Sequence, residues 1–295
     1  MFLGQFIILL LLVLFFSWSL SLMVPSRKRQ EISLESPLFL LMVAPEVFLA
    51  FTLALASFGE AVLGLAMGVN LISFLLIPGL VALFRGQVKV VVKNLRLDFF
   101  AVFLIVSLPL IFLGNLQLSR LEGLFLLAIG ILLFGWHWHL PSLVYELIFK
   151  RRVKITWRVL LGVLLSIIFF LFSVLMVFSL EIDPPLFILG LLPLALIVSL
   201  PEILVNLELT KKKPLVLLDG LLIPLVFNVT LVLGLAAFLS PFKIGELSAH
   251  FRSVLLFLLG FTLFYFFAWS RKRIDRKEGV ALVLFFFLSL VVILM

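Results

Sequence analysis

The sequence predicts an all-α integral membrane protein with ten transmembrane helices, arranged as two inverted repeats of five helices each. Three observations lead to this prediction: the extent of the apolar segments, the alternation of basic residues between loops, and an internal duplication. Of the 295 residues, 64% are hydrophobic, whereas soluble domains are about 45–50% apolar. The chain has no cysteine, which excludes disulfide bonds, thiolate metal sites and a cysteine nucleophile.

Apolar segments long enough to cross a bilayer follow one another along the whole chain. The first is not typical of signal peptides, because no basic residue precedes it and no small-residue cleavage pattern follows it. We therefore interpret it as the first transmembrane helix. The ten predicted helices have the approximate limits 2–24, 37–57, 61–84, 98–115, 119–136, 156–180, 184–207, 214–239, 250–270 and 279–295.

Basic residues gather in alternate loops of this ten-helix arrangement. The loops after the first, third, fifth, seventh and ninth helices hold 20 of the 23 Lys and Arg residues, and only Arg120, Lys243 and Arg252 lie on the other side. By the positive-inside rule the five basic loops are cytoplasmic, and both termini lie outside the cytoplasm. We predict a location in the plasma (inner) membrane. The net charge of +8 then reflects topology and attraction to anionic membrane lipid, and not nucleic-acid binding.

Two Pro-Glu pairs indicate an internal duplication. Glu46 and Glu202 lie 156 residues apart, and each is followed by an apolar stretch with a Gly-Leu pair, FLLIPGLVAL at 74–83 and VTLVLGLAAF at 229–238. Because each copy has an odd number of helices, the second copy is inverted relative to the first. The predicted repeats are 1–148, which includes an interfacial linker, and 149–295. Inverted repeats with interrupted helices at matching positions are typical of secondary transporters.

The linker between the fifth and sixth helices reads GWHWHLPSLVYELIFKRR. Its tryptophans, its tyrosine and its basic end predict a short segment lying in the membrane interface. His137 and His139 have two interpretations, as metal ligands or as side chains among the lipid headgroups.

The Pro-Glu pairs also predict a polar centre inside the membrane. Proline breaks a helical hydrogen bond, so Pro45 and Pro201 predict broken or kinked helices with freed carbonyl groups. A charged side chain in mid-membrane costs about 3 kcal/mol, so Glu46 and Glu202 imply a compensating cation or proton. The alternative is that both glutamates are protonated and only hydrogen-bond between helices.

Other polar side chains share helical faces with this centre. Ser199 lies three residues before Glu202 on one helix, and Asn70 and Ser73 share a face of the third predicted helix. Asn228 lies on the eighth predicted helix. These side chains have two interpretations, as further ligands of a cation or as hydrogen-bonding contacts between helices.

These residues resemble the motifs of the sodium/calcium exchanger superfamily, the calcium:cation antiporters. Each repeat of that family carries G-[TS]-S-x-P-E on one helix and G-S-N-x-x-N/D on the next. The first repeat here, with its alpha-1 region at about 37–84, has APE and GVNLIS. The second, with its alpha-2 region at about 191–239, has SLPE and FNVTLVLGLAAFLSP. The resemblance implies the ten-helix inverted fold with external termini, and cation exchange as the activity.

The resemblance also implies a set of ion ligands. Its members are Glu46, Glu202, Ser199, Ser73, Asn228 and, beside them, Asn70. The chain departs from the family where hydroxyl residues are expected, at Met42, Val43 and Val198. We therefore expect the flanking sodium sites of the family to be absent here.

The sequence therefore predicts a secondary active antiporter that moves Ca²⁺ or another cation in exchange for H⁺ or Na⁺. Two retained carboxylates and few hydroxyls favour proton coupling. The alternative is a transport-inactive membrane scaffold or binding protein that keeps the exchanger fold. We expect no enzyme activity, because HExxH, a phosphate loop and a compact Ser/His/Asp cluster are missing. The expected partners are an inorganic cation and membrane lipid, with no resident cofactor, no nucleic acid and no obligate protein partner.

Overall fold

The computed structural model describes residues 37–91, 99–137, 186–212, 215–217, 224–244 and 247–295, with isolated helical residues between 7 and 13 and between 161 and 175. Helices occupy eight of the ten predicted spans. The other two spans, 2–24 and 156–180, lie outside the described residues apart from those isolated positions. Most of the predicted interfacial linker, including His139, also lies outside them, and His137 is the last residue of a helix.

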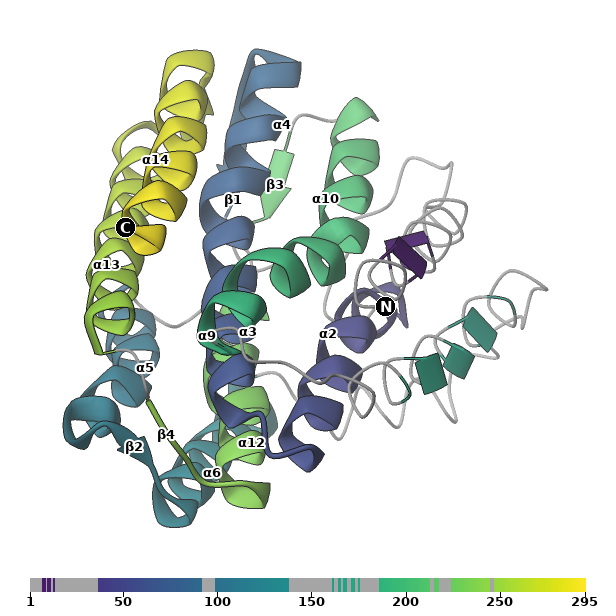
Figure 1. The fold of residues 1–295 in the computed structure, drawn as a ribbon. Coiled ribbons are helices and arrows are strands. Elements are labelled where there is room, and N and C mark those ends of the chain that lie inside the picture. The colour runs from purple at the N-terminus through teal and green to yellow at the C-terminus, as the bar shows by residue number, and fades with distance from the viewer. Residues whose placement is uncertain are drawn as a thin grey trace.

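The helices of the first half are α2 (Pro37–Leu55), α3 (Gly59–Leu71), η1 (Ile72–Leu76), α4 (Ile77–Arg85), α5 (Phe99–Phe112), η2 (Leu113–Asn115) and α6 (Arg120–His137). Those of the second half are α9 (Leu186–Leu189), η4 (Gly190–Leu194), α10 (Ala195–Lys212), η5 (Asn228–Val232), α12 (Leu233–Leu239), α13 (Leu247–Arg271) and α14 (Arg276–Leu294). The segments α3, η1 and α4 follow one another without a break, as do α9, η4 and α10 (Figure 1).

Four helices in the described part of the chain are long and apolar enough to cross a membrane. They are Gly59–Arg85, Leu186–Leu207, His250–Arg271 and Arg276–Leu294. Two shorter apolar helices span Pro45–Leu55 and Pro224–Leu239. The positions of these six helices agree with the apolar segments read from the sequence.

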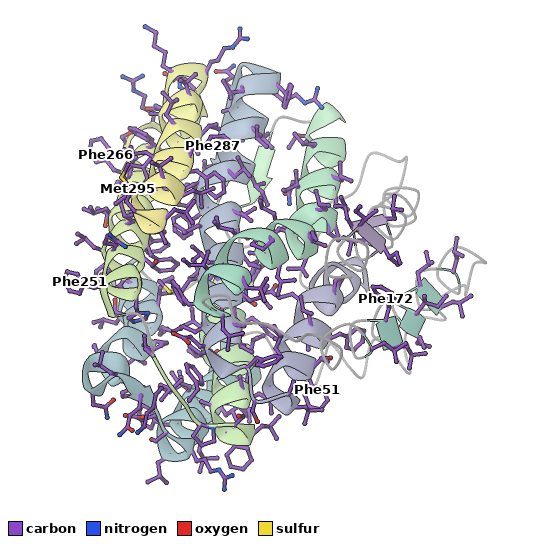
Figure 2. The ribbon with its side chains drawn as sticks, viewed as in Figure 1. Phe51, Phe172, Phe251, Phe266, Phe287 and Met295 are labelled. Atoms are coloured by element: carbon purple, nitrogen blue, oxygen red, sulfur yellow. The ribbon has the colours of Figure 1, made fainter. Side chains whose placement is uncertain are left out.

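The long helix formed by α3, η1 and α4 lies at the centre of the bundle. Every residue from 61 to 79 is buried, which explains why this stretch is apolar on all sides. By contrast, α13 and α14 are buried on one face only. Their outward side chains are large and apolar, and Figure 2 shows Phe251 and Phe266 at the outer edge of the bundle. This is the pattern of helices that face lipid.

Two small sheets lie at opposite ends of the bundle, and the sequence did not predict them. One has the order β3-β1-β5, from Leu215–Leu217, Gln87–Val91 and Arg273–Asp275. The other pairs β2 (Gln117–Leu118) with β4 (Phe242–Lys243). The 25-residue helix α13 runs from one sheet to the other, a rise of about 37 Å. Figure 1 shows β2 and β4 at the lower end of the view, with α4, α10 and α14 reaching the upper end.

The two sheets group the loops in the same way as the distribution of basic residues does. Strands β1, β3 and β5 lie in three of the five loops that were predicted to be cytoplasmic, and they meet in one sheet. Strands β2 and β4 lie in two loops predicted for the other side, and they pair with each other. These five loops therefore lie at the ends that the alternation of basic residues predicts.

Local features recur at a spacing of 156 residues. Among the described non-glycine residues, Leu116 and Lys272 both adopt a positive φ. Three residues further on, each half has a side chain that caps a helix, Ser119 at α6 and Asp275 at α14. The helix packing repeats as well, since α14 packs on α4 and α6 packs on α12. Such recurrence supports an internal duplication of the fold.

The two helices with Pro-Glu pairs are not broken at their prolines. Helical geometry continues through Pro45 in α2 and through Pro201 in α10. The structure therefore excludes a break at either proline, and a kink there stays a prediction; Figure 1 shows the ribbon changing direction along α10. The interruption in this helix lies earlier, in the π-helical segment η4 (Gly190–Leu194), which contains Pro193. A π-helical turn absorbs the missing hydrogen bond without ending the helix.

Candidate ion-binding site

Glu46 and Glu202 are both buried inside the bundle, on α2 and α10, two helices that pack against each other. Their exposed fractions are 4% and 8%. No Lys or Arg of the described residues forms an ion pair with either of them. Two carboxylates in this position cannot both be ionised without a cation between or beside them.

Ser73 joins the central helix to Glu202. Its Oγ donates a hydrogen bond of 2.8 Å to Glu202 Oε2, and both side chains are buried. This contact links residues that are 129 positions apart in the sequence. A hydroxyl that donates to a carboxylate keeps its lone pairs, so Ser73 Oγ still has acceptor capacity for a cation.

Ser73 and Asn228 both lie in π-helical segments. Ser73 belongs to η1 (Ile72–Leu76), and Asn228 is the first residue of η5 (Asn228–Val232). The two segments begin 156 residues apart. Short π-helical turns within α-helices occur frequently at functional sites. Their matched positions here place one polar side chain of each half in the interior of the bundle.

The amide of Asn228 contacts the amide of Asn70. Asn228 Nδ2 donates a hydrogen bond of 3.0 Å to Asn70 Oδ1, and both residues have exposed fractions of 1% or less. This contact joins the two halves of the chain a second time. It leaves Asn228 Oδ1 free as an acceptor, because the amide bonds through its nitrogen.

Several polar atoms of this interior have no hydrogen-bond partner. The unpartnered oxygens are Glu46 Oε1, Glu202 Oε1, Ser199 Oγ and Asn228 Oδ1. Buried polar groups without a partner are rare, because each costs about 1–3 kcal/mol. The four oxygens have lone pairs that can bind a cation.

The chemistry of these atoms restricts the occupant. Carboxylate, hydroxyl and amide oxygens are the ligands of hard cations such as Ca²⁺, which takes six to eight of them. Within the described residues, no group of three or more His, Cys, Asp and Glu side chains gathers to hold a metal ion. This composition favours a hard cation over zinc, copper or iron in this region.

Close helix contacts fix the position of the site. Gly64 on α3 lies directly against the backbone of Phe187, and Gly190 lies directly against that of Ala61. Small residues allow two transmembrane helices to approach this closely. The helix with Ser73 and the helix with Glu202 therefore cross in contact, a few turns before the residues of the site.

Sequence reasoning missed two partly buried polar contacts near these helices. Arg85 Nη2, at the end of α4, donates a 3.0 Å hydrogen bond to the carbonyl of Leu207 on α10. Asn206 lies four residues after Glu202 on α10, and its Nδ2 donates to the backbone carbonyl of Glu202 at 2.9 Å. The basic residues near Arg85 predicted only the membrane topology of this loop, and no sequence signal predicts the contact between Arg85 and α10.

Membrane-length apolar helices with two buried glutamates between them are features found in membrane transporters of cations. A family model described as "Sodium/calcium exchanger protein" matches residues 6–138 and again 154–295. Because these matches cover most of the chain, the chain belongs to the sodium/calcium exchanger protein family. The family is one of cation antiporters, and the chain is an integral membrane protein of this class.

Solved structures of exchangers share the fold. A structure of the sodium-calcium exchanger NCX_Mj, soaked with 2.5 mM Na⁺ and 0.1 mM Sr²⁺, aligns with a TM-score of 0.64 at 19% identity over 99% of both chains. The H⁺/Ca²⁺ exchanger CAX aligns with a TM-score of 0.64 at 19% identity, over 98% of this chain and 82% of that chain. A search of the curated proteins by sequence found no match.

Proposed function

We propose that the protein is a secondary active antiporter that moves Ca²⁺ or another hard cation in exchange for H⁺. Its ligands are Glu46, Glu202, Ser199, Ser73 and Asn228, with Asn70 holding the amide of Asn228. The single observation that supports this most strongly is the burial of two carboxylates, one from each half of the chain, on helices that pack against each other. The unpartnered oxygens around them supply further ligands for one shared ion.

Proton coupling follows from the types of ligand. A carboxylate can exchange a metal ion for a proton, whereas a hydroxyl or an amide cannot. The positions that carry hydroxyl residues in the family are apolar here, and Val198 is buried with an exposed fraction of 2%. An apolar side chain supplies no ligand for a separate sodium ion. The carboxylate pair thus alternates between an ionised form with the cation and a protonated form without it.

The transport cycle requires two symmetry-related halves. We infer ten spans, with the second half, 149–295, inverted relative to the first, 1–148. The recurrence at 156 residues and the match of one family model to each half support this arrangement. Glu46 and Glu202 then approach the ion from opposite directions near the midplane, as in other inverted-repeat transporters.

The experiment is cation uptake into liposomes that contain the purified protein. A pH gradient should drive ⁴⁵Ca²⁺ uptake more strongly than a sodium gradient of equal size. Glu202→Gln should abolish uptake, whereas Glu122→Gln, which alters a glutamate at the start of α6 outside the site, should not. Uptake driven by sodium alone would contradict proton coupling and leave the antiporter assignment intact.

A transport-inactive binding protein is the second candidate. The apolar residues at Met42, Val43 and Val198 favour it, because they remove hydroxyl groups that the resemblance associates with transport. This candidate predicts that neither gradient drives uptake of Ca²⁺ or other cations. It also predicts that the Glu46→Gln and Glu202→Gln variants are stable and correctly inserted, and that neither variant loses the function of the unmodified protein.

A further inference from the structure

The outer face of strands β1 and β5 carries two like charges directly opposite each other. In their antiparallel register Lys89 faces Arg273, and both side chains are exposed. Their neighbours in the strands, Val88 and Ile274, point inward and are fully buried. Like charges at directly opposed positions destabilise a pair of strands. An anion bound between them would remove this repulsion.

Nearby carboxylates do not supply that anion. Asp275 Oδ1 accepts the backbone N–H of Glu278 at 2.9 Å, and its Oδ2 lies 3.6 Å from Arg271 Nη1. Glu278 Oε2 in turn accepts the backbone N–H of Asp275 at 2.8 Å. Both carboxylates are therefore engaged in capping α14. Among the residues that the structure describes, Lys89 and Arg273 have no ion-pair partner.

The internal repeat supplies a built-in comparison. Position 117 corresponds to position 273 at the spacing of 156 residues, and the strand pair at the other end of the bundle places Gln117 opposite Lys243. That pair has one charge and no repulsion. Lys243 corresponds to Gln87 and not to Lys89 at this spacing, so the two strand pairs differ in register, and the opposed like charges occur in the β1–β5 pair.

The surroundings of the charged pair are those of a membrane interface. Strand β5 is the edge strand of its sheet and joins α13 to α14, two helices with large exposed apolar faces. Just before this end of α13, Trp269 is 67% exposed and stacks on Tyr265, with ring centroids 5.7 Å apart. Exposed aromatic rings mark the headgroup level of a bilayer. Figure 2 shows nitrogen-tipped side chains at the end of the bundle where α14 begins.

We propose that this surface, formed by Lys89, Arg273, Arg271 and Trp269, binds the headgroup of an anionic phospholipid. The phosphate lies between the guanidinium of Arg273 and the ammonium of Lys89, and the acyl chains follow α13 past Trp269. A phosphate accepts several charge-assisted hydrogen bonds from such groups. The inference is independent of the transported ion.

The test is quenching of tryptophan fluorescence in nanodiscs that hold the full-length protein. Trace phosphatidylglycerol with brominated acyl chains is added to a phosphatidylcholine bilayer and compared with brominated phosphatidylcholine. The signal of Trp269 is the difference between the protein and its Trp269→Phe variant. Brominated phosphatidylglycerol should quench this signal at a several-fold lower mole fraction, and 1 M salt should remove most of the preference, because salt screens exposed charges.

The variants make the test specific. Arg273→Gln and Lys89→Gln should each weaken the preference about fivefold, as expected for one basic side chain at a membrane surface. The control Lys243→Gln, at the other end of the bundle, should leave it unchanged. The effect of Arg273→Gln on the melting temperature should also have opposite signs in the two lipids. The substitution should raise the melting temperature in pure phosphatidylcholine, because it relieves the charge repulsion, and lower it with phosphatidylglycerol.

Three outcomes would overturn the proposal. Equal quenching by the two brominated lipids would show that no anionic lipid is enriched. An equal loss with Lys243→Gln would show a general effect of net charge. Competition by inorganic phosphate at the same concentration as the lipid would assign the surface to a soluble anion instead.

Discussion

Ser73 donates a hydrogen bond of 2.8 Å to Glu202 across 129 residues of sequence. This contact binds the central helix to α10 and orients one carboxylate oxygen, while Glu202 Oε1 remains without a partner. The serine therefore does two things in the proposed site. It fixes the direction of the carboxylate, and it offers a hydroxyl oxygen to the same ion.

Ser73→Ala tests this relationship. Hydrogen bonds to charged groups contribute about 1.5–3 kcal/mol, so we expect the apparent cation affinity in liposome uptake to fall about ten- to hundredfold. Ser73→Thr keeps the hydroxyl and should retain most of the affinity. If Ser73 only joins helices, Ser73→Ala will lower the melting temperature and leave the apparent affinity unchanged.

The amide contact between Asn70 and Asn228 predicts energetic coupling between the two halves. A double-mutant cycle with Asn70→Ala and Asn228→Ala should give a coupling energy of about 1 kcal/mol in thermal unfolding. Asn115→Ala, which alters an exposed asparagine of η2, should be additive with Asn228→Ala. Additivity of the Asn70 and Asn228 changes would show that the amide contact contributes nothing.

Helix crossing at Gly190 predicts strong sensitivity to a single methyl group. A Cβ atom there would overlap the backbone of α3 at Ala61, and overpacking of this kind costs about 1–3 kcal/mol. Gly190→Ala should therefore lower the melting temperature and the uptake rate together. Gly114→Ala is the matched control, because no atom lies within 4 Å of its added Cβ. Equal effects of the two changes would contradict the close crossing.

The cap of α14 predicts a local dependence on pH. The backbone N–H of Glu278 bonds to Asp275, and this lowers the pKa of that carboxyl below its ordinary value, with a further contribution from Arg271. A depressed pKa in the folded state means that the cap stabilises the helix above about pH 4 and is lost as the pH falls through the folded pKa. Hydrogen exchange of the first turn of α14 should therefore accelerate in acid.

The first turn of α6 provides the control for that experiment. There the group that accepts the backbone N–H of Glu122 is the hydroxyl of Ser119, at 3.3 Å, and a hydroxyl does not titrate in this range. We expect a smaller change of exchange rate at α6 than at α14. Asp275→Asn should make the acid acceleration of hydrogen exchange in the first turn of α14 similar to that in the first turn of α6. Equal acceleration in both helices of the unmodified protein would refute this account of the cap.

Several parts of the fold could be predicted from the sequence because they follow from hydropathy and charge. The positions of α3–α4, α13 and α14 follow from apolar segments of sufficient length, and the grouping of β1, β3 and β5 at one end follows from the basic loops. Glu46 and Glu202 could be selected because a carboxylate within an apolar segment is expensive. These signals are local, so a single sequence contains them.

Other parts depend on contacts that no local pattern describes. The π-helical segment at Gly190–Leu194 contains Pro193 and makes the close crossing with α3, whereas the sequence placed the break or kink at Pro201. The bond between Asn70 and Asn228 depends on the relative rotation of two helices from different halves. The short strands form where three loops meet at one end of the bundle and two loops meet at the other, which composition does not reveal.

The central claim is that Glu46 and Glu202 share one cation. Equilibrium binding of Ca²⁺ to the purified protein, measured by isothermal titration calorimetry at several pH values, tests it most directly. We predict one ion per chain, proton release on binding that grows as the pH falls, and loss of binding in both Glu46→Gln and Glu202→Gln. Two ions per chain, or full binding in either variant, would contradict a shared site.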